Sequence, residues 1–283
     1  MSETYMGRFG YFRDLPDIRD YHAATASVAK ILKESKPLKG LTTLPPSVDL
    51  RAWCSPIEDQ GNLGSCTANA GVGVLEYFER RAFGKYLDAS RLFLYKTERD
   101  LLGWHGDTGG FLRTTMEVMV LFGVPPESYW PYVVANYDIE PSSFLYALAD
   151  NYKAYSYYRL DPAVTPKAQA LTNVKTYLAA GLVCMFGFTV YASFPSVGSG
   201  KIDIPYPAPG EKVLGGHAVD AVGYDDNRVI GGHKGALLIR NSWGINWGDK
   251  GYGWLPYDYV LNGLANDFWT LVHALFVDTD LFK

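Results

Sequence analysis

A cysteine, a histidine and an asparagine occur in an order and in local settings that could build a nucleophilic site. Cys66 ends the run Gln-Gly-Asn-Leu-Gly-Ser-Cys, His217 lies in Gly-Gly-His-Ala-Val, and Asn241 opens Asn-Ser-Trp-Gly. A thiol, an imidazole and an amide can act as the nucleophile, its base and the group that orients the base. The spacing therefore predicts acyl chemistry on a thiol.

The local sequence indicates how each group would act. Ser65 is a good helix N-cap, which would place Cys66 in the first helical turn, at the positive end of the helix dipole. His217 would stabilise the thiolate and return a proton to the leaving group. Asn241 would accept a hydrogen bond from the far nitrogen of that ring. The side-chain amide of Gln60 and the backbone N–H of Cys66 would stabilise the oxyanion.

Each of these residues has an ordinary reading when it is taken alone. Cys66 could be a buried structural thiol, and His217 could be a core histidine with satisfied hydrogen bonds. Zinc is a weak rival, because Cys66, His217 and His105 lack the close ligand spacing of zinc sites. The combination favours catalysis, and we expect no metal and no cofactor.

With these residues in place, the chain resembles the papain family of cysteine peptidases. The family pattern is met at Gln60, Cys66, His217 and Asn241, and the run Asn-Ser-Trp-Gly-x-x-Trp-Gly-Asp-Lys-Gly-Tyr at 241–252 is highly specific. The resemblance implies an α+β fold with a helical left lobe, a right lobe that is a small β-barrel, and the active site in the cleft between them. It also implies an endopeptidase that forms an acyl-thioester.

The resemblance further implies how a substrate would bind. Gly109 and Gly110 would form a cleft wall whose backbone pairs with an extended peptide. Phe186 and Ala218 would line an apolar pocket for the second residue before the cut, which would favour Leu, Val or Phe there.

Two tryptophans match the family pattern, and two positions differ from it. Trp243 would shield the contact between the orienting amide and the imidazole, and Trp247 would line the leaving-group side. Leu63 stands where the family usually has a cysteine, and Thr67 where it has an aromatic residue. The usual disulfide through the first position is therefore absent, which fits a reducing compartment or a bacterial branch of the family.

The chain divides into an arm and a body. Residues 1–47, called the arm here, precede a peptidase domain at 48–283, with a helical lobe at about 48–150 and a β-rich lobe at about 151–283. Helices are expected from Cys66 to near Gly84, at 90–102 and at 111–122. Strands are expected at 183–191, 217–224 and 235–241, with a turn at Asp225-Asp226-Asn227.

The arm has two readings. It could be a docked terminal segment, or a short cap like a pro-segment in which Phe9 to Tyr21 cover the cleft and restrain activity. It is shorter than the family's usual pro-segment, so a full folded pro-domain is not expected.

The bulk composition limits the partners. The chain has 283 residues, 48% hydrophobic residues and a net charge of −4, so it has no basic footprint for nucleic acid. An uncharged run at 176–200 is broken by glycine and proline, and no membrane span or signal peptide is expected. We therefore expect a monomer that acts on peptides or proteins, either cytoplasmic or exported by a non-classical route.

Some alternatives stay open at this stage. Cys54 and Cys184 could pair or could be two buried thiols. A thiol acyltransferase or amidase with a non-peptide substrate, and an inactive relative that binds peptides, remain rival functions.

Overall fold

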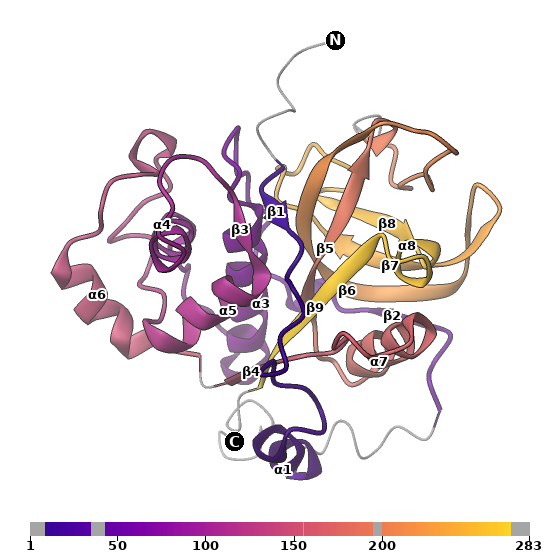
Figure 1. The fold of residues 1–283 in the computed structure, drawn as a ribbon, viewed down its shortest axis with the longest axis horizontal. Helices are drawn as coiled ribbons and strands as arrows, with labels where there is room; N and C mark the ends of the chain where they lie inside the picture. The colour runs from indigo at the N-terminus through magenta and orange to yellow at the C-terminus, as the bar shows by residue number, and fades with distance from the viewer. Residues whose placement is uncertain (1–8, 35–42, 155, 195–199, 273–283) are drawn as a thin grey trace.

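The computed structural model describes residues 9–34, 43–154, 156–194 and 200–272. One half of the molecule is helical and the other half is built on a sheet (Figure 1). The helical half contains α3 (Cys66–Phe83), α4 (Arg91–Leu101), α5 (Leu112–Leu121) and α6 (Ser143–Ala149). Short 3-10 helices lie at Arg51–Trp53, Val134–Asn136 and Asp150–Tyr152. The three helices expected in this half are confirmed, and Gly84 ends α3 with a φ of 69°.

The other half holds one large sheet with antiparallel pairings. Its strands lie in the order β4-β9-β5-β6-β7-β8, and β2 also pairs with β6. Their bounds are β2 (Ser47–Asp49), β4 (Ser156–Arg159), β5 (Cys184–Tyr191), β6 (Val213–Ile230), β7 (His233–Arg240), β8 (Tyr252–Pro256) and β9 (Ala265–Val272). Helices α7 (Lys167–Ala179) and α8 (Asp258–Leu261) lie against it. The class is therefore α+β, as the sequence predicted.

The expectation of a β-barrel is corrected, because the sheet is not closed. No pairing joins β4 to β8 within the part of the chain that the structure describes. The register gives the reason. β5 pairs with the first part of β9, from Ala265 to Trp269, whereas β4 pairs with its last part, from Trp269 to Val272. The end strand β4 therefore continues toward the helical half instead of returning to β8.

The predicted turn at Asp225-Asp226-Asn227 is also corrected. Strand β6 runs through these residues to Ile230, and the pairing with β7 shifts between Asp225 and Val229. The chain reverses after the end of β6, at Gly231 and Gly232, whose φ angles are 57° and 90°. Two consecutive glycines with positive φ suit a tight hairpin, so the acidic run forms an irregularity in the strand instead.

The two halves meet where α3 packs against β5 and β6. Gly73 permits this close approach, because a Cβ there would lie 2.3 Å from both Arg240 Nη1 and Asp220 Oδ2. Those two side chains form a buried ion pair between β7 and β6. The N-terminal end of α3 is thereby held beside the middle of the sheet.

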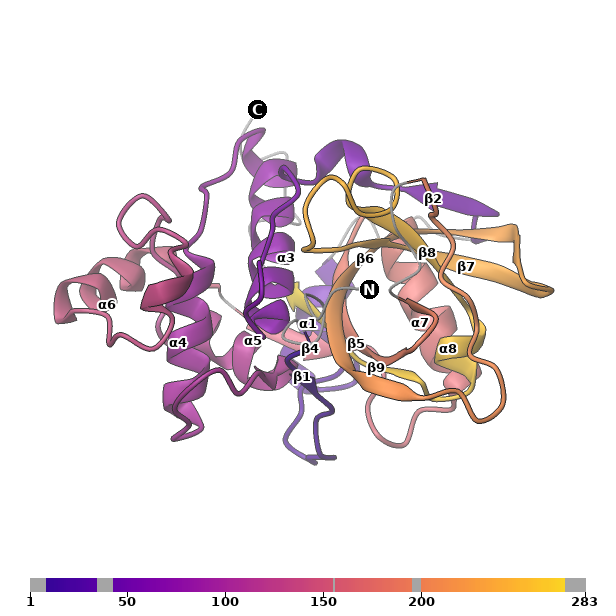
Figure 2. The same cartoon turned by 90° about the horizontal axis from the view of Figure 1, so that it is seen from above.

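The arm lies between the two halves. Its strand β1 (Tyr11–Phe12) pairs in parallel with β3 (Gly110–Phe111), and it also contacts β5 and β6 (Figures 1 and 2). Helix α1 (Ala26–Glu34) follows, with Val28 buried in the core of the sheet half. Among the helices that the structure describes, none is both long and apolar enough to cross a bilayer.

Candidate active site

Cys66 is the first residue of α3 and is fully buried. Ser65 occupies the N-cap position, but its hydroxyl makes no capping hydrogen bond. The Ser65 Oγ instead lies 2.6 Å from the Tyr132 hydroxyl and accepts a hydrogen bond from Asn69 Nδ2 at 3.1 Å. The turn before the cysteine is therefore held by side chains of the helical half. The backbone N–H of Thr67, in the first helical turn, interacts with the Cys66 sulfur.

His217 lies on β6, and Asn241 directly follows β7, the neighbouring strand. The His217 Nε2 and Asn241 Oδ1 atoms are 2.7 Å apart. Because an amide oxygen can only accept, Nε2 carries the hydrogen of this bond. The backbone N–H of Ser242 donates to the same oxygen at 2.8 Å, and the backbone of Asn241 is anchored to the Gly251 carbonyl at 2.9 Å. This contact fixes both the plane and the tautomer of the imidazole.

Aromatic rings enclose the imidazole. The centroid of the Trp243 ring lies 4.9 Å from that of His217, and Phe188 and Phe194 lie at 5.9 and 6.3 Å. Trp247 packs on Phe194 at 5.8 Å and on Trp243 at 6.2 Å. Trp243 is thus placed to exclude water from the hydrogen bond between the imidazole and the amide.

Gln60 is tied to the residue that follows Asn241. Its Oε1 accepts a hydrogen bond from Ser242 Oγ at 2.6 Å, and its Nε2 donates to the Leu63 carbonyl at 2.8 Å. The backbone N–H of Gln60 donates to the Ser242 carbonyl at 2.9 Å. Sequence reasoning missed Ser242, although its place inside the Asn-Ser-Trp-Gly motif could have drawn attention to it. The dipeptide Asn241-Ser242 therefore holds both the His217 imidazole and the Gln60 side chain by hydrogen bonds.

The Cys66 sulfur lies where the two halves and the arm meet. Burial raises the pKa of the thiol to about 12, and the Glu98 carboxylate raises it further. The backbone N–H groups of Ala218, Gly10 and Thr67 lower this pKa. Ala218 directly follows His217, so the structure brings the Cys66 thiol to the strand that carries the histidine. With the arm in place, burial therefore disfavours the thiolate form of Cys66.

The expected substrate residues are brought together only in part. Gly110 donates its backbone N–H to the Gly10 carbonyl at 2.8 Å, and Gly109 has a φ of 79°. Ala218 belongs to the same buried apolar group as Tyr11 of the arm. Phe186 instead lies in the core of the sheet half, where its ring stacks on Phe268 with the centroids 4.6 Å apart.

Comparison with known proteins settles the family. The sequence model of the papain family of cysteine proteases matches residues 44–267. The chain belongs to this family. An uncharacterized peptidase C1-like protein of Acanthamoeba polyphaga mimivirus is 34% identical over 281 residues, covering 95% of this chain and 88% of that protein.

Solved structures agree with the family assignment. Xylellain, a cysteine protease from Xylella fastidiosa, is 35% identical with a TM-score of 0.76, over 96% of this chain and 98% of that one. A digestive procathepsin L 3 of Tenebrio molitor is 21% identical with a TM-score of 0.65, over 84% of this chain and 75% of that one, and supports the fold alone. The protein is a papain-family cysteine protease and thus a hydrolase.

The two departures from the papain pattern have structural counterparts. Leu63 is buried, and Cys54, Cys66 and Cys184 are all free buried thiols. Thr67 Oγ1 donates to Glu98 Oε1 at 2.6 Å, so a polar contact stands where an aromatic residue was expected. Burial raises the pKa of Glu98 to about 7. Nothing in the sequence singled out Glu98, because its burial depends on residues far along the chain.

A metal centre finds no support. The described part of the chain holds no cluster of three or more histidine, cysteine or acidic side chains that could bind a metal ion. His105 and His217 are not part of such a group among the described residues.

We expect Gln60→Ala to lower kcat by about 10²- to 10³-fold, because an oxyanion would lose one preorganised donor. Steady-state kinetics on a peptide substrate would measure the fall. Gln169→Ala, at an exposed position on α7, is the matched control and should leave kcat unchanged. A Gln60→Ala variant with normal kcat would remove Gln60 from the site.

Proposed function

We propose that this papain-family protease is an endopeptidase that uses Cys66, His217 and Asn241. The Cys66 thiolate attacks the peptide carbonyl, and a carbon–sulfur bond forms as the carbon–nitrogen bond breaks. The His217 imidazolium gives its Nδ1 proton to the leaving amine, while Nε2–H stays bound to Asn241 Oδ1. The observation that supports this best is the 2.7 Å contact between His217 and Asn241, because the next residue on the strand, Ala218, contacts the Cys66 sulfur through its backbone N–H.

The second half of the proposed reaction releases the acid. Water attacks the thioester, His217 takes its proton, and the sulfur leaves as thiolate. The oxyanion of each step is stabilised by the Cys66 backbone N–H and the Gln60 amide. Ser242 acts as a positioning residue, because its hydroxyl holds the Gln60 oxygen away from the cleft.

The course of the arm supports cleavage within a chain. Phe9 lies beside His217 and Trp243, with ring centroids 6.3 and 5.9 Å away. Gly10 meets the Cys66 sulfur, and Phe12 lies 5.8 Å from Trp104 on the other side. The arm thus extends past the Cys66 sulfur on both sides. A substrate that binds in the same way needs no free terminus beside the sulfur.

We expect the full chain to cut a denatured protein at internal bonds, and Cys66→Ser to cut at least about 10⁴-fold more slowly, since the nucleophile is lost. Mass spectrometry of the products would map the cuts. Cys54→Ser, the same change at another buried thiol, should keep the activity. Removal of terminal residues alone would contradict endopeptidase action. Equal cutting by Cys66→Ser would contradict the mechanism.

We further propose that the arm, from Phe9 to Tyr21, restrains the enzyme. Its backbone pairs with the Gly110 wall that a substrate would use, and it buries the thiol. Gly10 allows this fit, because a Cβ there would lie 1.7 Å from the Gly64 carbonyl oxygen. Any larger residue at position 10 is incompatible with the docked arm.

Gly10→Val should therefore displace the arm and raise both peptidase activity and alkylation of Cys66 by iodoacetamide. We expect an increase of more than about tenfold, because an accessible thiol with a pKa near 8.5 has far more thiolate. Ala24→Val adds similar bulk at an exposed arm position and should change neither rate. Equal rates for Gly10→Val and the unmodified chain would show that the arm does not restrain the enzyme.

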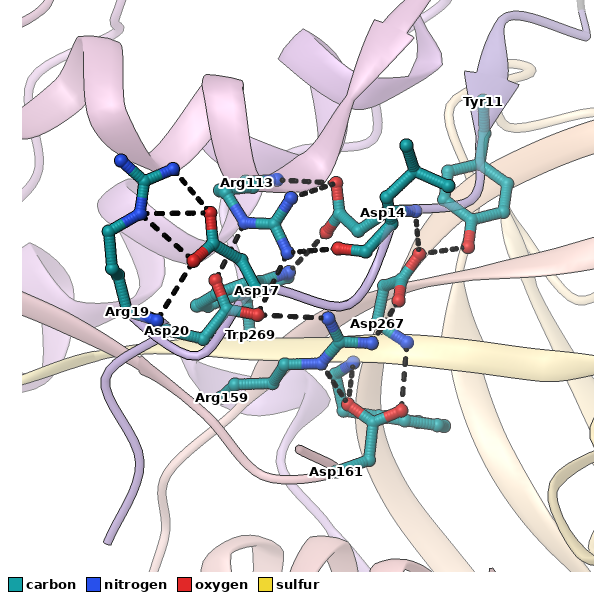
Figure 3. A network of polar contacts seen from close by, with 12 residues as sticks. Tyr11, Asp14, Asp17, Arg19, Asp20, Arg113, Arg159, Asp161, Asp267 and Trp269 are labelled. Atoms are coloured by element: carbon teal, nitrogen blue, oxygen red, sulfur yellow. Dashed lines mark hydrogen bonds and ion pairs between the residues drawn. The ribbon is translucent and has the colours of Figure 1, made fainter. Parts of the chain in front are cut away.

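A buried charged cluster holds the arm behind the active site (Figure 3). Asp14 of the arm accepts a hydrogen bond from Trp269 Nε1 at 2.8 Å and faces Arg113, Arg159 and Asp267. Burial raises the pKa of Asp14 to about 7; the Asp267 carboxylate raises it, whereas Arg113, Trp269 and Arg159 lower it. On a released arm the same carboxyl would have its ordinary pKa near 3.8.

The sign of the pH dependence follows from this difference. Between these two pKa values, the Asp14 carboxyl is protonated on the docked arm and ionised on the released arm. Proton binding by Asp14 therefore favours docking, and this contribution is complete below the lower pKa. That contribution is lost as the pH rises through about 7. Acid therefore tightens the arm, and neutral to alkaline pH loosens it.

We expect the Cys66 alkylation rate of the full chain, divided by that of Gly10→Val at the same pH, to rise from pH 5 to 8. The slope is at most about tenfold per pH unit. Asp14→Asn stays neutral throughout and should flatten this ratio. Indistinguishable pH profiles for the unmodified chain and Asp14→Asn would exclude Asp14 as the titrating group.

A further inference from the structure

Tyr11 of the arm fills a pocket beside the nucleophile. Its ring lies over the backbone of β5 and β6, because a Cβ at Gly187 would lie 2.0 Å from the ring and one at Gly216 would lie 2.9 Å from it. Tyr11 follows Gly10, which contacts the Cys66 sulfur, and it shares a buried group with Ala218. Gly187, rather than Phe186, lies behind the ring, and it pairs with Ala218, which the family resemblance assigned to the pocket for the second residue before the cut.

The floor of this pocket is a carboxylate. The Tyr11 hydroxyl donates to Asp267 Oδ2 at 2.5 Å, and Asp267 is fully buried (Figure 3). Asp267 has a φ of 61°, an uncommon conformation for a residue with a side chain. Asp161 holds it there by accepting the backbone N–H groups of Asp267 at 2.9 Å and of Phe268 at 2.8 Å. The aspartate is thus kept at a strained position, as is common at functional sites.

The charges around Asp267 change when the arm leaves. With the arm docked, the cluster contains the carboxylates Asp14, Asp20, Asp161 and Asp267 and the guanidinium groups of Arg113 and Arg159. Asp14 and Asp20 belong to the arm and leave with it. The remaining carboxylates and guanidinium groups are equal in number, so the emptied pocket attracts a cation only weakly.

The hydrogen bonds of Asp267 change as well. Its Oδ1 keeps Arg159, but its Oδ2 loses both the Tyr11 hydroxyl and the backbone N–H of Asp14, which donates at 2.7 Å. A buried acceptor without its donors is costly, so the pocket favours a ligand that brings a donor to the same depth. A phenol does so without placing a second positive charge beside Arg159.

We propose that Asp267 is a specificity-determining residue and that the enzyme selects substrates with tyrosine in this pocket, in preference to phenylalanine. This inference rests on the proposed peptidase function. It adds a polar requirement to the apolar preference for Leu, Val or Phe that the sequence predicted. The arm then acts as an internal ligand, with Tyr11 in the place of the substrate side chain.

Fluorogenic peptides that differ only at the second residue before the cut test this. For the full chain, kcat/KM should be about 10- to 100-fold higher with Tyr than with Phe, as a hydrogen bond to a buried charge predicts. Asp267→Gly removes the carboxylate without strain at its positive φ, and should bring this ratio to about 1 while the Phe peptide is still cut. Asp267→Asn is a second variant with the same size of side chain and should also reduce the ratio. Asp203→Gly, at an exposed aspartate, should leave the ratio unchanged.

A second measurement does not need peptidase activity. Tyr11→Phe removes the hydroxyl that donates to Asp267 and keeps the aromatic ring of the arm in the pocket. It should therefore loosen the arm and raise iodoacetamide alkylation of Cys66 by about 10- to 100-fold. Equal kcat/KM for the Tyr and Phe peptides, or a stronger preference for Arg, would overturn the proposal. If no peptide is cut, the peptidase function fails, and unchanged alkylation in Tyr11→Phe would then separately overturn the role of Asp267.

Discussion

The close packing of α3 against β6 is the contact on which the rest of the site depends. It brings the first residue of a helix, Cys66, to the backbone of Ala218, which directly follows His217. Gly73 makes the approach possible, since any side chain there would collide with the buried pair of Arg240 and Asp220. A buried ion pair that loses one partner typically costs about 3–5 kcal/mol, so this interface has little freedom to adjust. Cys66 and His217 are therefore placed by the core of the molecule.

The Asn241-Ser242 dipeptide, which follows β7, positions two different side chains. Asn241 orients the imidazole, and Ser242 orients the Gln60 amide, so a shift of this turn would disturb both together. The aromatic rings of Trp243, Phe188 and Phe194 keep the imidazole in a dry environment, where its hydrogen bond is stronger than in water. The site is thus preorganised before a substrate arrives.

The arm contacts both halves of the molecule. Its backbone pairs with β3 at Gly110, and its acidic residues Asp14 and Asp20 enter a cluster with Arg113 and Arg159. In the proposed restraint of the enzyme, docking depends on a proton because the arm adds more buried carboxylates than the guanidinium groups can balance. The arm is thus held by close packing at Gly10 and Tyr11 and by ion pairs at Asp14 and Asp20.

The sequence by itself predicted which residue types carry the chemistry, and the helix and strands expected to hold them are present. Cys66 at a helix start and the Asn-Ser-Trp-Gly run are read within a few residues of chain, and those elements formed as expected. Other features needed the tertiary structure, including the open sheet, the continuation of β6 past Asp225, and the burial of Glu98 and Asp267. Their physical reason is shared: the register of a strand and the environment of a carboxylate are set by partners far away in the chain. Asp267 is buried because β9, Arg159 of β4 and the arm meet around it, and no local sequence pattern predicts that contact.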